Sequence, residues 1–133
     1  MNIRLLKRVR DYILAEPRRV NMAVWGDIRS GNVAPACGTV ACIAGWTKVL
    51  VKRPNLAKLI QDAGKLDDFF DDADKVAKEK LGLSLNQAQQ LFYVHHWPSP
   101  FETRYNRSRL SKQRARVVAD RIDYFIATEG DEK

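Results

Sequence analysis

Residues 39–52 constrain the fold more than any other segment of this chain. Between Val40 and Val51 nearly every residue is apolar, whereas a helix at a protein surface carries a polar face. Thr39 is a suitable N-cap, and Pro54 follows at the distance expected of a helix stop. The segment therefore predicts a helix buried in the middle of a helical domain, with the other helices around it.

Apolar residues in the remaining segments recur at three- and four-residue spacing, which is the helical period. The pattern predicts further helices that end near Ala15, cover about 56–64, 66–82 and 84–92, and run from Ser108 or Ser111 to about Thr128, with one further turn at 101–105. We expect a single all-α domain of five or six helices over residues 1–128, followed by a frayed polar tail at 129–133. The residues expected in its core are Leu6, Val9, Ile13, Ile43, Trp46, Leu50, Leu91, Phe92, Ile122 and Phe125.

The charge of the chain is unevenly distributed. The 133 residues carry a formal net charge of +7, of which residues 1–60 contribute +8, residues 61–102 contribute −4 and residues 103–133 contribute +3. Such a field attracts an anionic partner, or lets one part of the fold dock on another. Neither a membrane span nor a secretory signal is expected, and the two cysteines favour the reducing cytoplasm.

Both cysteines lie in the stretch Cys-Gly-Thr-Val-Ala-Cys-Ile-Ala-Gly-Trp at residues 37–46. A helix N-terminus lowers the pKa of a nearby thiol, so Cys37 is a candidate nucleophile with His95 or His96 as its base. No Asn or Asp that would orient such a histidine is evident, and free cysteines are commonly buried. We therefore expect no catalytic residue, and the thiol enzyme stands as the alternative.

The residues Cys37, Cys42, His95 and His96 also have the composition of a zinc site. The spacing of the two cysteines lies at the edge of the usual range for paired ligands, and the side chains of adjacent histidines in a loop diverge. We expect neither a metal nor another cofactor.

An aromatic and basic region follows the histidines. Its aromatic residues alternate with arginines, a pattern suited to stacking on nucleic-acid bases or to docking on an acidic protein. We favour the interpretation that Trp97 and Phe101 close the end of the helical core, since a small domain needs large aromatic side chains, and we keep the binding hypothesis beside it. The candidate binding residues are Trp97, Phe101, Arg104, Tyr105, Arg107, Arg109 and Arg114.

The basic stretch 104–116 overlaps the start of the last helix. Cations at a helix N-terminus oppose the helix dipole, so an anionic group is expected to compensate them. That group is either the acidic segment 67–74 within the fold, or a phosphate backbone or acidic protein outside it.

The stretch at 37–46 resembles a C-G-T-x-x-C-x-A-G-W signature of a family of small bacterial and phage proteins. The likeness continues, in the same order, at residues 81–92, 97–101 and 119–126. The resemblance implies a compact domain that is often encoded on phage or mobile genomes. The family has no assigned activity, so no catalytic residue, cofactor or partner carries over.

Together these features predict a non-enzymatic, cytoplasmic binding protein of a phage or mobile-element accessory type. Its partner is expected to be a macromolecule, with a protein favoured over nucleic acid. The alternatives are a thiol enzyme that uses Cys37, and nucleic-acid binding through 104–116. No membrane association is expected, and the oligomeric state is left open.

Overall fold

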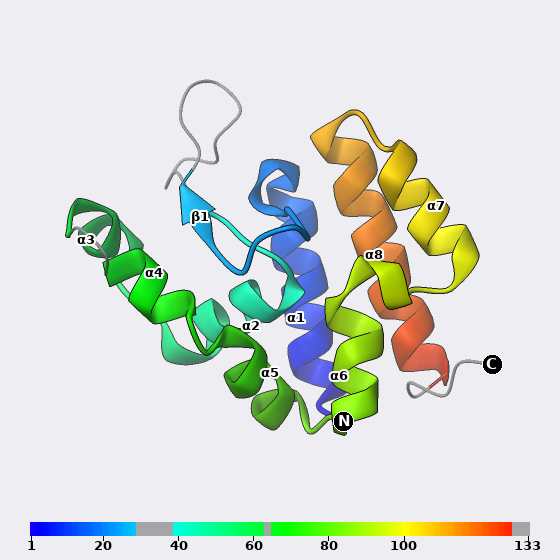
Figure 1. Ribbon diagram of the computed structural model, residues 1–133, viewed down its shortest axis with the longest axis horizontal. Coiled ribbons are helices and arrows are strands. Elements are labelled where there is room, and N and C mark those ends of the chain that lie inside the picture. The colour runs from blue at the N-terminus through cyan, green and yellow to red at the C-terminus, as the bar shows by residue number, and fades with distance from the viewer. Residues whose placement is uncertain (29–38, 63–64, 129–133) are drawn as a thin grey trace.

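The described part of the chain, residues 1–28, 39–62 and 65–128 of a computed structural model, is built almost entirely from helices (Figure 1). In chain order its elements are α1 (Ile3–Ala15), the 3-10 helix η1 (Pro17–Arg19), β1 (Asp27–Ile28), β2 (Thr39–Val40), α2 (Ile43–Lys52), α3 (Leu56–Gln61), α4 (Lys65–Phe70), α5 (Ala73–Leu81), α6 (Leu85–Phe92), the 3-10 helix η3 (Val94–His96), α7 (Ser99–Arg107) and α8 (Ser111–Thr128). Helix α2 lies in the centre, with α1, α5 and α6 packed against it. The expected all-α domain around an apolar central helix is confirmed.

Helix α2 is buried even where its residues are polar. Every residue from Ile43 to Val49 is buried. The hydroxyl of Thr47 donates to the carbonyl of Ile43 at 2.7 Å, and the indole N–H of Trp46 donates to the carbonyl of Arg19 at 2.9 Å. Because these polar groups are hydrogen-bonded inside the protein, other elements can enclose the helix at little cost in desolvation.

Helix α2 begins later than predicted, at Ile43 instead of near Thr39. Thr39 and Val40 form β2, which pairs antiparallel with β1. The N–H groups of Ala41 and Cys42 donate to carbonyls earlier in the chain, at 2.9 and 3.0 Å. Backbone that is extended and hydrogen-bonded to another segment cannot be part of the helix, so Cys42 is the N-cap in place of Thr39.

The single helix expected over 66–82 is divided into α4 and α5. An uninterrupted helix would pair the carbonyl of Phe69 with the N–H four residues further on. The ammonium group of Lys48, which reaches across from α2, donates to this carbonyl instead and also forms an ion pair with Asp72. The division thus coincides with a tertiary contact, which local periodicity does not reveal.

Two helix ends carry clear local signals, and most of the expected core is confirmed. Gly82 ends α5 with φ +68°, in the left-handed region that favours glycine. Ser84 and Gln87 form the reciprocal capping box of α6, with N–H to side-chain distances of 2.9 and 3.1 Å. Of the ten residues expected in the core, Leu50 alone is half-buried and the others are buried.

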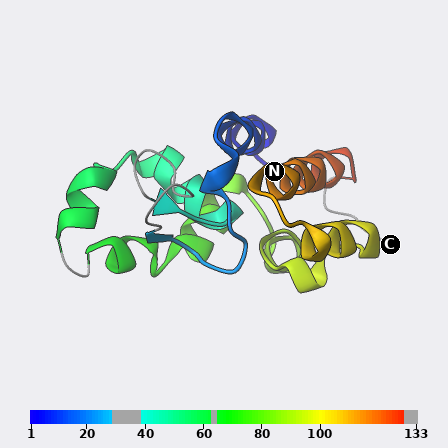
Figure 2. The ribbon, with the colours of Figure 1, turned by 90° about the horizontal axis from the view of Figure 1, so that it is seen from above.

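The helices are arranged in an elongated molecule with two distinct ends. In both views α8 lies between α1 and α7. Helices α7 and α8 form one end of the molecule, and α3 and α4 form the other (Figures 1 and 2). Among the described residues, no helix is both long enough and apolar enough to cross a membrane.

Candidate binding surface on the helical hairpin

Helices α7 and α8 form a hairpin that carries most of the predicted binding residues. The range 101–105, expected to make a single turn, belongs to a nine-residue helix that has Pro100 in its first turn, where a proline is tolerated. Gln113 closes the connection between the two helices. Its Oε1 atom accepts hydrogen bonds from the backbone N–H groups of Arg109 and Leu110, at 3.1 and 3.3 Å.

The aromatic residues at the base of the hairpin face inward. Trp97 is 4% exposed, and its indole N–H donates to the carbonyl of Leu91 at 2.9 Å. Tyr105 packs edge-on against Trp97, with 5.6 Å between ring centroids, and its hydroxyl oxygen accepts from the N–H of Met22 at 2.8 Å. Trp97 therefore closes the core, and its prediction as a surface binding residue is wrong, because the ring is covered on all sides.

Phe101 and Tyr105, the other two aromatic candidates, are half-buried. The ring of Phe101 contacts that of Tyr124, with 5.2 Å between centroids. Burial raises the pKa of Tyr105, so its phenol is neutral across the physiological range. Both residues support the hairpin and offer at most an edge to a partner.

A buried arginine holds the aromatic residues of the hairpin in place, and it was not among the predicted site residues. Arg121 in α8 is 0% exposed, and its Nη2 atom donates to the carbonyl of Gln90 at 2.9 Å. The ring centroids of Trp97, Phe101 and Phe125 lie 5.7–5.8 Å from its guanidinium carbon, within the range of a cation–π contact. The sequence holds a signal for it, since Arg121 precedes Phe125 by four residues on the apolar stripe of the helix.

A groove of about 400 Å³ runs between the two helices on the outer side of the hairpin. Its lining is Thr103, Arg104, Arg107, Ser108, Gln113, Arg116 and Val117. The sequence from 103 to 119 contains six Lys and Arg residues and no Asp or Glu. The groove is therefore lined mainly by hydrogen-bond donors and cations.

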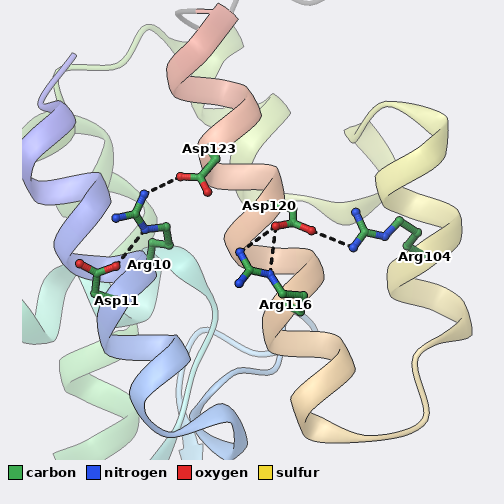
Figure 3. Close-up of polar contacts among 6 residues, drawn as sticks. All are labelled: Arg10, Asp11, Arg104, Arg116, Asp120 and Asp123. Atoms are coloured by element: carbon green, nitrogen blue, oxygen red, sulfur yellow. Dashed lines mark hydrogen bonds and ion pairs between the residues drawn. The ribbon is translucent and has the colours of Figure 1, made fainter.

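Two of the arginines in the groove share one carboxylate, that of Asp120 (Figure 3). Arg104 Nη2 lies 2.8 Å from Asp120 Oδ2, while Arg116 Nε and Nη2 lie 3.0 and 2.8 Å from Oδ1. Burial alone would raise the pKa of Asp120, but the hydrogen bonds from both arginines outweigh it and the pKa is lowered. Asp120 is thus ionised at neutral pH and holds both guanidinium groups in place.

A second set of ion pairs ties the hairpin to the rest of the fold. Arg10 of α1 contacts Asp11 in its own helix at 2.9 Å and Asp123 of α8 at 2.6 Å (Figure 3). These hydrogen bonds raise the pKa of Arg10, which keeps its positive charge. The hairpin is therefore fastened to α1 on the side away from the groove.

The remaining predicted cations differ in their surroundings. Arg107 and Arg109 are exposed, and neither side chain forms an ion pair with another described residue. Arg114 is half-buried, and its charge acts on the hydroxyl of Tyr105 against the effect of burial. The structure brings Arg104 and Arg107 together with Arg116 in the groove, and leaves Arg109 at the tip of the hairpin.

The acidic segment 67–74 does not compensate these cations. It belongs to α4 and the start of α5, at the far end of the molecule from the hairpin (Figures 1 and 2). Among the ion pairs of the described residues, Asp120 is the partner of the cations at 104–116. The prediction that 67–74 compensates these cations is therefore wrong. Most of the positive charge at 104–116 faces solvent.

The thiol of Cys42 is unsuited to catalysis. Cys42 is 1% exposed and free, and its sulfur accepts the N–H of Gly45 at 3.5 Å as the cap of α2. Burial raises the pKa of this thiol to about 11, against the opposing effect of the helix N–H groups. Cys37, the predicted nucleophile, lies outside the described residues.

His95 and His96 are exposed side chains in η3. Their rings lie 4.3 Å apart between centroids, and both also contact the ring of Tyr93. In the described ranges, which exclude Cys37, no three His, Cys, Asp or Glu residues gather in a way that could hold a metal ion.

The chain matches no protein-family model, and neither a curated protein nor a solved structure is significantly similar to it.

Proposed function

We propose that this protein binds an acidic protein through the α7–α8 hairpin, and that it is not an enzyme. The main support is the excess of cations on this surface, where six Lys and Arg residues between 104 and 116 face one paired carboxylate, that of Asp120. Like charges held on one rigid surface repel each other, and a partner of opposite charge relieves the repulsion.

The tip of the hairpin favours a protein over nucleic acid. Leu110 is 63% exposed and lies next to Arg109 in the sequence. An apolar side chain surrounded by polar and charged groups is the usual pattern of a protein interface. The rings of Trp97 and Tyr105, which single-stranded nucleic acid would use for stacking, are engaged inside the fold.

Binding of double-stranded nucleic acid through 104–116 is the second candidate. The same excess of arginines favours it, because contacts to a phosphate backbone require cations and no stacking surface. The two candidates share one surface and differ in the partner.

The biological setting is part of the proposal. The resemblance of residues 37–126 to a bacterial and phage family supports an accessory protein of a phage or mobile element. The free thiol of Cys42 agrees with a cytoplasmic location, where thiols stay reduced.

The test compares two double variants that change the net charge equally. Arg107→Glu with Arg109→Glu alters the hairpin, and Arg4→Glu with Lys7→Glu alters exposed cations of α1, away from the groove. The probes are a labelled peptide rich in Glu and Leu and a labelled DNA duplex, measured by fluorescence anisotropy at low and moderate salt. We expect the peptide to bind, and the hairpin variant to lose about tenfold or more in affinity while the α1 variant stays near wild type.

Each result has a definite meaning for the proposal. Equal losses in the two double variants would show that attraction depends on net charge and would reject the hairpin as the site. Binding of the duplex alone, with a steep dependence on salt, would replace the first candidate by the second. If neither probe binds at low salt, both candidates are rejected.

A further inference from the structure

We propose that the groove between α7 and α8 holds a phosphate monoester of the partner protein, carried by a phosphoserine or phosphothreonine, between the guanidinium groups of Arg104, Arg107 and Arg116. This inference rests on the function proposed above, which it narrows from acidic proteins to phosphorylated ones. The three arginines line one groove of about 400 Å³, to which both helices contribute.

The polar groups of the groove are arranged to donate hydrogen bonds. Gln113 directs its Oε1 atom to the N–H groups of Arg109 and Leu110, which leaves its NH₂ group as a donor for the groove. Thr103 adds an exposed hydroxyl. A group with several acceptor oxygens and no donor, such as a phosphate, matches this lining.

Asp120 positions two of the arginines without exhausting them. A guanidinium has five N–H donors, and Asp120 takes one from Arg104 and two from Arg116. The other N–H groups of both residues have no hydrogen-bond partner among the described residues. Their orientation is thus fixed before a ligand arrives, which lowers the entropy lost on binding.

The charge of the groove favours a phosphate monoester over a carboxylate. Three guanidinium groups and the one carboxylate of Asp120 leave a net charge of +2 at this place. A phosphorylated side chain carries a charge of about −1.5 to −2 at neutral pH, whereas a carboxylate or a phosphodiester carries −1. Arginine clusters of this kind are a common means of recognising phosphorylated segments.

The experiment uses one short peptide in three forms, with a central Ser, phosphoserine or Glu. Each is titrated at low salt into the ¹⁵N-labelled full chain and followed by two-dimensional NMR, which also detects weak binding. We expect the phosphoserine form to bind about tenfold or more tightly than the Glu form, with shifts concentrated in α7 and α8. Arg104→Gln and Arg116→Gln should each lower the affinity about tenfold, and Lys7→Gln on α1 should leave it unchanged.

Arg107→Gln keeps the test decisive if the other two variants fold poorly, because the exposed Arg107 side chain forms no ion pair with a described residue. Equal affinity of the phosphoserine and Glu forms would overturn this inference and leave the proposed function standing. Phosphoserine binding that survives the loss of Arg107 and Arg104 would overturn it as well, since the site would lie elsewhere. If no form binds, the inference and the proposed function fall together.

Discussion

The segment around α2 and the α7–α8 hairpin both contain conspicuous residues, but the polar groups of the first are buried and those of the second are largely exposed. Around α2 the thiol of Cys42, the indole of Trp46 and the ammonium of Lys48 are all buried and hydrogen-bonded within the fold. On the hairpin Trp97 is buried and Phe101 and Tyr105 are half-buried, while Arg107 and Arg109 are exposed to solvent. A concentration of unusual residues in the sequence thus marks the core in one case and an exposed basic surface in the other, and burial is what distinguishes them.

The largest effect that would test this distinction concerns Trp97. Replacing Trp97 by Ala should lower the free energy of unfolding by about 3–5 kcal/mol, because a large buried side chain is removed and the carbonyl of Leu91 loses its donor. Urea unfolding followed by circular dichroism measures this. Leu110→Ala at the exposed tip is the control and should change stability by less than about 0.5 kcal/mol. A stable Trp97→Ala protein with impaired binding would place Trp97 on the interaction surface after all.

Gly45→Ala tests how closely the segment that contains Trp25 packs against α2. A Cβ atom at residue 45 would lie 1.9 Å from the carbonyl oxygen of Trp25 and 2.7 Å from the Cβ of Ala41, so backbone must move. We expect a loss of about 3 kcal/mol in stability, measured by thermal or urea unfolding.

Gly82→Ala is the matched comparison for Gly45→Ala. Gly82 has a positive φ, but the nearest atoms to an added Cβ are 3.5 Å away, so the loss should be about 1 kcal/mol from backbone strain alone. Equal losses at the two positions would mean that the contact between Trp25 and α2 is not tight.

The reactivity of Cys42 provides a chemical test of burial around α2. A pKa raised from 9.0 to about 11 lowers the thiolate fraction at neutral pH about a hundredfold, and burial reduces access further. In a Cys37→Ser variant, alkylation of Cys42 by iodoacetamide should therefore be at least about a hundredfold slower in buffer than in denaturing urea, as measured by mass spectrometry. Comparable rates would contradict the burial of this thiol.

The smallest effect expected is that of Asp120 on acid stability. Its pKa is lowered in the folded state, so its contribution is present above the unfolded value near 3.8 and is lost as the pH falls through the folded value. Because the pairs are partly exposed, Asp120→Asn should cost only about 0.5–1 kcal/mol at pH 7 and should flatten the acid side of the stability curve.

Asp67→Asn on α4 serves as the control for Asp120→Asn, since Asp67 is exposed and forms no ion pair with a described residue. Stability is measured by urea unfolding from pH 7 to pH 3. Identical pH profiles for the two variants would show that the pairing of Asp120 with Arg104 and Arg116 does not persist in solution.

Features that depend on neighbours along the chain could be predicted from the residues alone. The helical class, the burial of the segment that became α2, and the helix ends near 82 and 84 were predicted from local spacing, and Gly82 and Ser84 are the residues that set those ends. The basic stretch was also evident, because its arginines are close together in the sequence.

The environment of those local features depends instead on contacts that form when the chain folds. Lys48 contacts the carbonyl of Phe69 where α4 ends, and α2 begins only after the strand pairing at 39–40 and the backbone hydrogen bonds of Ala41 and Cys42. All of these contacts join segments far apart in the chain. The same holds for Trp97, which is covered by other helices, and for Arg104, which meets Asp120 across the hairpin. Local periodicity carries no information about such contacts, since their energies come from groups that only the fold brings together.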